Sequence, residues 1–292
     1  MSYVITLIAD RAVTALTRAI TDSVREAIAG GEPVVLSPGE ATDIPVAAAP
    51  DIATIRAALA GMPIDAIAST TENRRKRLLV ADMDSTIVTG ETLDELADFA
   101  GLKDRIAAIT ARAMNGELDF KSALRERVAM LSGLPVDALE RTWQRVCLTT
   151  GARELVMTMR AHGAFTALVS GGFSFFTSRV AATCGFDVHR SNVLLDDGSV
   201  LLGRVAEPIL DRDTKLATLT GLAAERGLAL SATLAVGDGA NDLDMLRVAG
   251  LGVAFHAKPI VAAAAQARVD HGNLRALLFA QGYQAEEIDG QA

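Results

Sequence analysis

The stretch that decides the fold spans residues 77–95 and reads RLLVADMDSTIVTGETLDE. It opens with the apolar run LLVA, which is typical of a buried β-strand. Asp82 and Asp84 follow this run directly, and Glu91 comes a few residues later. Carboxylates this close repel one another, so a strand that ends in them calls for a chemical explanation.

The chain after residue 77 alternates between strand-like and helix-like segments. Strands are expected at residues 78–84, 165–172, 232–239 and 250–257, and helices at 152–162, 173–184, 213–226 and 241–249. This alternation predicts an α/β fold, a doubly wound parallel sheet of the Rossmann type with helices on both faces. Ligands bind beyond the carboxyl ends of such strands, where Asp82, Asp84, Ser170 and Asp238 should meet.

Two further regions complete the predicted architecture. Residues 92–150 look helical throughout and predict a helical cap inserted after the first strand, and residues 191–205 predict a hairpin. Residues 3–69 follow the order β-α-β-β-α-β of a small ferredoxin-like α+β domain. We therefore expect one domain at residues 1–72 and another at 73–292. The basic run at 74–77 is interpreted as a solvated surface linker between them.

Composition excludes several classes of function. The 292 residues are 50% hydrophobic and 22% charged, with a net charge of −8, so the chain should be globular and should bind no nucleic acid. Neither a signal peptide nor an apolar run of the ~18 residues that span a membrane is recognisable. Cys147 and Cys184 match no metal-binding spacing and indicate free thiols in a reducing compartment, so we expect a cytoplasmic protein.

Each polar motif has an ordinary interpretation when taken alone. The Asp82-Met83-Asp84 pair resembles a common turn, and SGGF at 170–173 resembles either a turn or an anion-binding nest. Lys215 could be a surface lysine at a helix start. GDGAND at 237–242 could be a loop with a helix cap at Asn241, or a metal-binding loop.

The motifs carry more information together, because the predicted sheet brings them to one edge. The carboxylates of Asp82, Asp84 and Asp238 offer the oxygen ligands that Mg²⁺ prefers. A hydroxyl, glycine amides and a lysine suit a phosphate dianion. The combination therefore suits a site that binds Mg²⁺ and a phosphate group.

The four motifs DMDST, SGG, Lys215 and GDGAND resemble those of the haloacid dehalogenase-like phosphohydrolases, over about residues 77–281. Within that superfamily, the cap stretch from Glu91 through residue 131 is similar to that of phosphoserine phosphatases. The N-terminal unit resembles the ACT-like regulatory domain attached to some of them. Whether this unit binds an amino-acid effector or forms a homodimer stays open.

The resemblance implies a Mg²⁺-dependent hydrolysis of O-phospho-L-serine, the last step of serine biosynthesis. Asp82 would be the nucleophile that forms an aspartyl-phosphate, and Asp84 the general acid and base. Mg²⁺ would be held by the Asp82 carboxylate, the Asp84 backbone carbonyl and Asp238. Adjacent carboxylates with opposite protonation states are a known way to divide such roles.

The same resemblance implies which residues bind the phosphoryl group. Ser170, the Gly171 amide and Lys215 would bind its oxygens, and a preorganised charge clamp is where the rate enhancement must come from. Asn241 and Asp242 would position Lys215 and the metal's water ligands.

Substrate selection is expected from the cap. By resemblance, Glu91 would bind the substrate's ammonium and Arg127 its carboxylate, while Met114 and Phe120 would form an apolar lid. Without the resemblance, a helix-start glutamate, a surface ion pair and two core residues would explain the same positions.

Three alternatives remain from the sequence. The chain could be another phosphatase or a phosphotransferase of the same superfamily, since the catalytic motifs do not separate these. A signalling receiver also uses Asp, Mg²⁺, Ser/Thr and Lys, but it needs neither the cap nor an acid/base at Asp84. A binding protein with an inactive site would not retain the full catalytic set.

Overall fold

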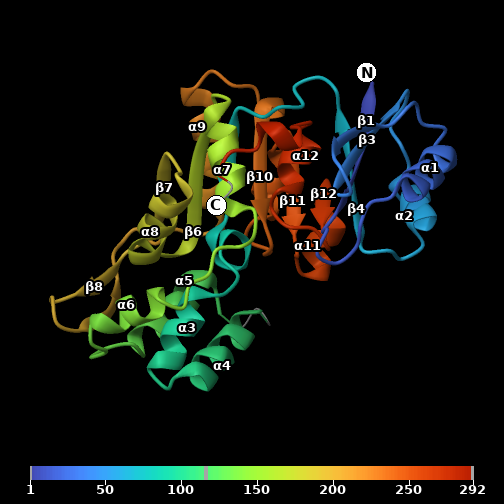
Figure 1. Cartoon of the computed structure of the whole chain (residues 1–292). Helices are drawn as coiled ribbons and strands as arrows, with labels where there is room; N and C mark the ends of the chain where they lie inside the picture. The colour runs from blue at the N-terminus through green and yellow to red at the C-terminus, as the bar shows by residue number, and fades with distance from the viewer. Residues whose placement is uncertain (1, 115–117, 291–292) are drawn as a thin grey trace.

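The central sheet of the molecule is parallel, as predicted, and has six strands (Figure 1). The computed structural model describes residues 2–114 and 118–290, without the side chains of residues 111, 113 and 114. The strand order is β12-β11-β10-β5-β6-β7. The strands are β5 (Leu78–Ala81), β6 (Phe165–Phe173), β7 (Val188–Asn192), β10 (Thr233–Gly237), β11 (Leu251–Phe255) and β12 (Ala267–Val269). The edge strands β7 and β12 were not predicted.

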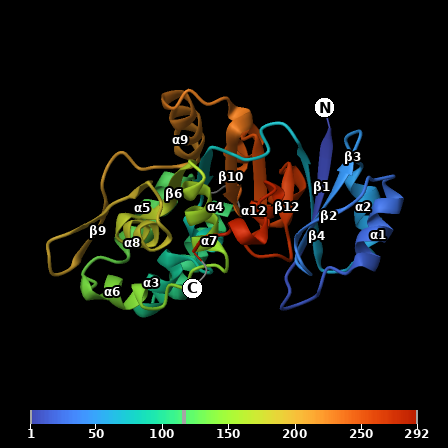
Figure 2. The same ribbon diagram turned by 45° about the horizontal axis from the view of Figure 1, so that its top comes forward.

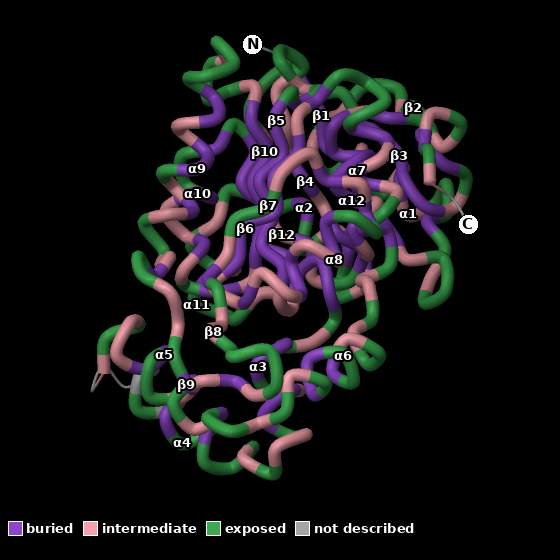
Figure 3. The backbone as a smooth tube through the Cα atoms, turned by 90° about the vertical axis from the view of Figure 1, so that its left-hand side faces the viewer, coloured by how far each residue is buried: buried purple, intermediate pink, exposed green. Residues whose placement is uncertain are grey.

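Helices cover both faces of this sheet, which is why β5 is apolar on every residue. Leu79 packs into a core shared with α7 (Ala152–Ala161), α8 (Ser174–Cys184) and α12 (Ala276–Ala280). Leu78 and Val80 point the other way, as alternation along a strand requires. They pack with α9 (Arg212–Glu225), α10 (Leu243–Val248) and α11 (Pro259–Ala264). Figure 3 shows these strands as the buried centre of the molecule.

The cap lies beyond the carboxyl edge of the sheet, and its described residues form four helices (Figure 1). They are α3 (Thr92–Phe99), α4 (Lys103–Met114), α5 (Phe120–Ala129) and α6 (Asp137–Trp143). The predicted hairpin is present as β8 (Leu194–Asp196) and β9 (Leu201–Val205), and β9 lies against α5. The chain enters and leaves the cap side by side, because the Thr149 N–H donates to the Ile87 carbonyl at 2.9 Å.

The N-terminal unit has the predicted β-α-β-β-α-β order and an antiparallel sheet, β2-β3-β1-β4. Its elements are β1 (Tyr3–Ala9), α1 (Arg18–Ala27), β2 (Val34–Ser37), β3 (Ala41–Val46), α2 (Ile52–Leu59) and β4 (Ile64–Thr70). Figure 2 shows α1 and α2 on the outer face of this sheet, away from the six-stranded sheet. Helix α1 begins at Arg18 because the Thr17 side chain caps it by accepting from the Ile20 N–H.

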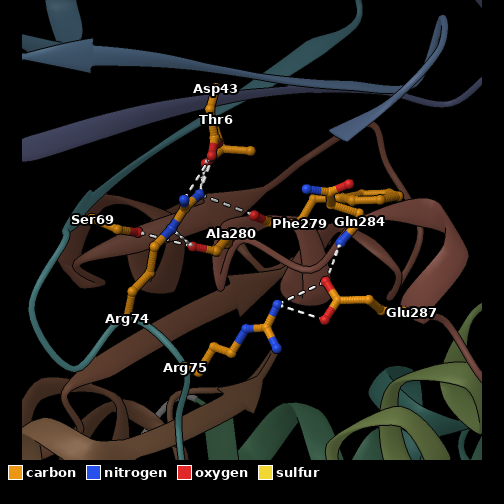
Figure 4. A network of polar contacts seen from close by, with 9 residues as sticks. All are labelled: Thr6, Asp43, Ser69, Arg74, Arg75, Phe279, Ala280, Gln284 and Glu287. Atoms are coloured by element: carbon orange, nitrogen blue, oxygen red, sulfur yellow. Dashed lines mark hydrogen bonds and ion pairs between the residues drawn. The ribbon is translucent and has the colours of Figure 1, made fainter. Parts of the chain in front are cut away.

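The interpretation of residues 74–77 as a solvated linker is wrong for Arg74 and Lys76. The Arg74 guanidinium forms an ion pair with Asp43 at 2.6 Å and donates to the Ala280 carbonyl at 3.0 Å (Figure 4). Lys76 is 7% exposed and its ammonium donates to the Ser231 carbonyl at 2.8 Å. Arg74 therefore docks the two units onto each other, while Lys76 binds within the unit that begins at residue 73. No helix among residues 2–114 and 118–290 has the length and apolar character to cross a membrane.

Candidate active site

A cavity of about 360 Å³ lies between the carboxyl edge of the central sheet and the cap. The strand ends supply its floor and α3 to α5 supply its roof. The lining residues that the sequence singled out are Asp82, Asp84, Glu91, Phe120, Arg127, Ser170, Gly171, Asp238 and Asn241. Lys215 lies just below, in a small adjoining hollow that Ser170, Gly171 and Asn241 also line.

Asp82 and Lys215 form a buried ion pair at the floor. Asp82 follows β5 and is 5% exposed, and Lys215 projects from the first turns of α9 and is 2% exposed. The ammonium lies 2.7 Å from the Asp82 carboxylate and 2.5 Å from Asp242. Burial, and then the charge of Asp242, raise the pKa of Asp82. Burial opposes the charge on Lys215, but its two carboxylate partners outweigh this and raise its pKa.

Asp84 lies beside the ion pair in a different environment. Its carboxylate accepts from the Thr92 N–H at 2.8 Å and from the Ser170 hydroxyl at 3.1 Å. Burial raises the pKa of Asp84, although both hydrogen bonds act against this rise. A carboxyl group whose pKa is raised retains a proton closer to neutral pH, which is the property that a general acid needs.

Gly172 lets the end of β6 approach Asp84 closely. A Cβ atom there would lie 2.9 Å from the nearer Asp84 oxygen and 3.0 Å from the Ser170 hydroxyl. The Gly172 N–H also donates to that hydroxyl at 2.8 Å. The absence of a side chain at this position therefore allows Ser170 and Asp84 to share one corner of the cavity.

Asn192 is a site residue that the sequence analysis missed. It is 2% exposed at the end of β7, and its side-chain amide donates to the Gly171 carbonyl at 2.8 Å and the Leu210 carbonyl at 3.3 Å. Its oxygen accepts from the Leu210 N–H at 2.7 Å. Asn192 thus joins the SGG segment to the segment that leads into α9 and Lys215. Asn192 could have been identified from the sequence only if β7 had been predicted.

Three carboxylates crowd the edge near β10. Oxygens of Asp82, Asp238 and Asp242 lie within 4.8 Å of one another. Asp242 is already engaged, since it pairs with Lys215 and accepts from the Gly239 N–H at 3.0 Å. Burial and the charge of Asp242 raise the pKa of Asp238. An all-oxygen cluster that holds more negative charge than one lysine balances suits a hard cation such as Mg²⁺.

The carboxylate of Asp84 does not belong to this cluster, because it turns toward Thr92 and Ser170. Its backbone carbonyl remains the group that it could offer to a metal.

Glu91 reaches the cavity from the start of α3. Its carboxylate accepts from the Ser85 hydroxyl at 2.7 Å. The residue as a whole is exposed at the cavity mouth, yet burial of its carboxyl end and the charge of Asp84 raise its pKa to about 7. Glu91 is therefore an acid whose charge changes near neutral pH.

Arg127 faces Glu91 from α5 across the cavity. Its guanidinium is half-buried and donates to the Ala123 carbonyl at 3.3 Å, and burial lowers its pKa. It forms no ion pair within 4 Å with any residue that the structure describes, so its charge is available to an anionic ligand. The expectation that a surface ion pair would explain Arg127 is not met.

Phe120 and Met114 are the apolar residues expected in the lid. Phe120 begins α5, is 38% exposed, and its ring lies 3.2 Å from the position that a Gly171 Cβ would take. It therefore spans the gap between cap and sheet. Met114 ends α4, and its side chain lies outside the described residues.

Lys258 is a second residue that the sequence analysis missed. It precedes α11, lines the cavity, and its N–H donates to the Asp238 carbonyl at 3.4 Å. Its charge acts to lower the pKa of Asp238, against the larger effect of burial. Nothing in a Lys-Pro pair after a strand distinguishes it from a surface lysine.

Comparison with known proteins places this site in a family. Residues 79–247 match the haloacid dehalogenase-like hydrolases. The chain is 45% identical over 205 residues to a phosphoserine phosphatase of Archaeoglobus fulgidus, covering 70% of this chain and 60% of that protein. It is 48% identical over 186 residues to a phosphoserine phosphatase of Streptococcus thermophilus, covering 64% and 86%.

The similarity to a solved structure extends over both units. A haloacid dehalogenase-family hydrolase of Salmonella enterica superimposes with a TM-score of 0.85 at 29% identity, covering 95% of this chain and 97% of that one. The archaeal relative is longer, and the match spans only 60% of its length. Family match, sequence identity and shared fold agree, and the chain belongs to the haloacid dehalogenase-like hydrolases.

Proposed function

We propose that the protein is a phosphoserine phosphatase, which hydrolyses O-phospho-L-serine to L-serine and phosphate. The observation that carries this proposal is the pairing of two features in one cavity. The buried Asp82–Lys215 pair lies at its floor, while Glu91 and the free charge of Arg127 lie at its roof. The second pair of opposite charges matches the ammonium and carboxylate that phosphoserine carries beyond its phosphate. The named relatives support the same substrate.

In the proposed reaction, a carboxylate oxygen of Asp82 attacks phosphorus and the P–O bond to the serine oxygen breaks. Asp84, with its raised pKa, donates a proton to that leaving oxygen. Water then attacks phosphorus in the aspartyl-phosphate while Asp84 takes the water's proton, and the P–O bond to Asp82 breaks. This step regenerates the Asp82 carboxylate and releases inorganic phosphate. Ser170, the Gly171 amide and Lys215 would bind the phosphoryl oxygens throughout.

Mg²⁺ would be held by the carboxylates of Asp82 and Asp238 and by the Asp84 carbonyl, and would supply positive charge to the phosphoryl group. The positive charge is needed because the repulsion between Asp82 and a phosphate dianion is large. Two like unit charges at 4 Å repel by about 4 kcal/mol at an effective dielectric near 20. Lys215 already shares its charge between Asp82 and Asp242, so it cannot offset a phosphate dianion alone. Asn241 would orient groups at this edge.

Substrate selection is assigned to the cap. Glu91 would bind the ammonium, Arg127 the carboxylate, and Phe120 and Met114 would close over the serine carbons. We also propose the division into residues 1–72 and 73–292, with the cap at 92–150. A cytoplasmic role as the last step of serine biosynthesis completes the proposal.

The test is phosphate release from L-phosphoserine with Mg²⁺ and after chelation. The panel adds D-phosphoserine, phosphothreonine and 4-nitrophenyl phosphate, each with and without an acceptor alcohol. We expect Mg²⁺-dependent turnover that is fastest with L-phosphoserine. A different preferred ester would identify another phosphatase of the family. Phosphate that moves mainly to the alcohol would identify a phosphotransferase, and a long-lived phosphoprotein without turnover would identify a receiver.

The variant Asp82→Asn tests the proposed nucleophile independently of which ester is the preferred substrate. The variant should stay folded and hydrolyse none of these esters, since the amide is no nucleophile. Asp213→Asn, which changes an exposed acid two residues from Lys215, is the matched control and should retain activity. Substantial activity in Asp82→Asn would remove Asp82 as the nucleophile.

A further inference from the structure

A buried carboxylate of the N-terminal unit binds a loop of the catalytic unit. Asp65 belongs to β4 and is 4% exposed. Its carboxylate accepts from the N–H groups of Asp270 at 2.7 Å, His271 at 3.2 Å and Gly272 at 2.7 Å. Three successive amides on one carboxylate are charge-assisted hydrogen bonds, the stronger kind, and they fix the course of residues 270–272.

The loop that Asp65 binds is in turn bonded to the edge of the active site. The His256 ring donates from Nε2 to the Gly272 carbonyl at 2.8 Å, and the His256 N–H donates to Val269 at 2.8 Å. His256 has φ of 43°, an uncommon conformation for a residue with a side chain, so surrounding contacts must hold it. Lys258 lies two residues further on and lines the cavity beside Asp238.

The same loop also touches the segment that leaves the cap. The Leu274 N–H donates to the Thr150 carbonyl at 3.0 Å. Gly151, the residue before α7, lies so close to the Arg275 backbone that a Cβ atom there would clash with the Arg275 nitrogen. The Thr149 N–H donates to the Ile87 carbonyl, in the segment that enters the cap. Residues 270–275 thus contact the N-terminal unit, the loop of Lys258 and the base of the cap.

We propose that Asp65 is a positioning residue for the active site, acting from the N-terminal unit. It holds residues 270–272, these hold His256, and His256 places Lys258 at the cavity, where the ammonium attracts the anionic substrate. This inference rests on the proposed function in one respect, because hydrolysis of phosphate esters is one of the two quantities measured in its test. It assigns to the N-terminal unit a part in the reaction that needs no bound effector.

The structure contains a control for this proposal. Asp43, 6% exposed on β3, docks the same two units through Arg74, which reaches the carbonyls of Phe279 and Ala280 (Figure 4). Asp43 and Asp65 are both buried acids at the junction, but of these two only Asp65 accepts hydrogen bonds from the loop at 270–272, while the side-chain partners of Asp43 among the described residues are Thr6 and Arg74. Removing either charge should weaken docking, and only one removal should reach the active site.

The experiment compares Asp65→Asn with Asp43→Asn in the full chain. Hydrogen exchange is followed at residues 255–258, and kcat and KM are measured for L-phosphoserine and 4-nitrophenyl phosphate. We expect Asp65→Asn to speed exchange at 255–258 and to lower kcat/KM for both esters about tenfold, mainly through KM. Asp43→Asn should lower Tm without either effect. Adding Asp65→Asn to Lys258→Ala should cause little further loss, because both act through one ammonium.

Three results would overturn the proposal: unchanged exchange and kinetics in Asp65→Asn, equal losses in Asp43→Asn, or fully additive losses with Lys258→Ala. If Asp65→Asn folds poorly, His256→Ala breaks the next link and leaves the Asp65 contacts in place. It should reproduce the rise in KM, and wild-type kinetics in it would also contradict the proposal. A wild-type enzyme inactive on phosphoserine would refute that substrate alone, since exchange and the aryl ester still report on Asp65.

Discussion

The Lys215 ammonium lies 2.7 Å from the Asp82 carboxylate, with both side chains almost fully removed from solvent. A pair this deeply buried is costly to break, because the remaining partner becomes an unpaired charge in a medium of low polarity. Lys215 also serves Asp242, so its loss leaves two carboxylates without their cation. The pair is therefore expected to support both the fold and the reaction.

Lys215→Met should lower the free energy of unfolding of the metal-free protein by about 3–5 kcal/mol and abolish ester hydrolysis. Urea titration with chelator present measures the first effect. The control is Lys121→Met, which removes a more exposed ion pair with Asp211 and should cost far less stability. Equal stability losses in the two variants would show that the buried ion pair contributes no more to stability than the exposed one.

Glu91 should make kcat/KM for phosphoserine fall at acidic pH. With a pKa of about 7, its carboxyl is mostly neutral below that pH and cannot attract the substrate's ammonium. We expect kcat/KM for phosphoserine to rise as pH increases through about 7, and Glu91→Gln to lack that rise. Hydrolysis of 4-nitrophenyl phosphate, which has no ammonium, should not depend on Glu91. If kcat/KM of Glu91→Gln rises with pH as in the wild type, another titrating group causes the rise.

The effect of Glu91 on stability has the opposite sign. Its pKa is raised above the ordinary 4.5, so the unfolded chain releases this proton first as pH increases. Stability from this group is full below about pH 4.5 and declines up to about pH 7. The residue is open to solvent at the cavity mouth, so the decline should be small, and Glu91→Gln should remove it in denaturant titrations at pH 5 and 8.

Arg127 should decide between phosphoserine and simpler esters. Arg127→Ala removes a half-buried guanidinium without an ion-pair partner among the described residues, and should lower kcat/KM for phosphoserine by ~100-fold, as loss of a charged contact of 2–3 kcal/mol implies. Arg125→Ala is the matched control, two residues away on α5 and exposed in an ion pair with Glu207. The aryl phosphate should lose little in either variant, and parallel losses on both esters would disprove the carboxylate assignment.

Asn192 should act on phosphate binding without touching the substrate. Asn192→Ala removes three hydrogen bonds that join Gly171 to the segment before α9, at a cost of about 1–3 kcal/mol in stability. We expect weaker inhibition by inorganic phosphate as well. Gln266→Ala also removes two side-chain hydrogen bonds to backbone carbonyls, far from the cavity, and should leave that inhibition constant unchanged. A similar change in both would assign Asn192 to stability only.

The order of strands and helices was predictable because local patterns carry it. The run at Leu78–Ala81 reads as a doubly covered strand, and the Asp-Asp-Gly turn marks the hairpin of β8 and β9. The short edge strand β12 has three residues and no apolar run, so periodicity could not reveal it.

The sequence alone determined which residue types meet at the carboxyl edge, since strand order and motif spacing deliver Asp82, Ser170, Lys215 and Asp238 there. Tertiary structure alone decided which carboxylate pairs with which cation, because burial and ångström-scale separation depend on packing between distant segments. It also revealed that Arg74 is a docking residue, and it brought Asn192, Lys258 and Asp65 into relation with the site. Their partners lie 18 to 207 residues away along the chain or in loops without a motif. Contacts of that range arise only when the chain has closed into one core.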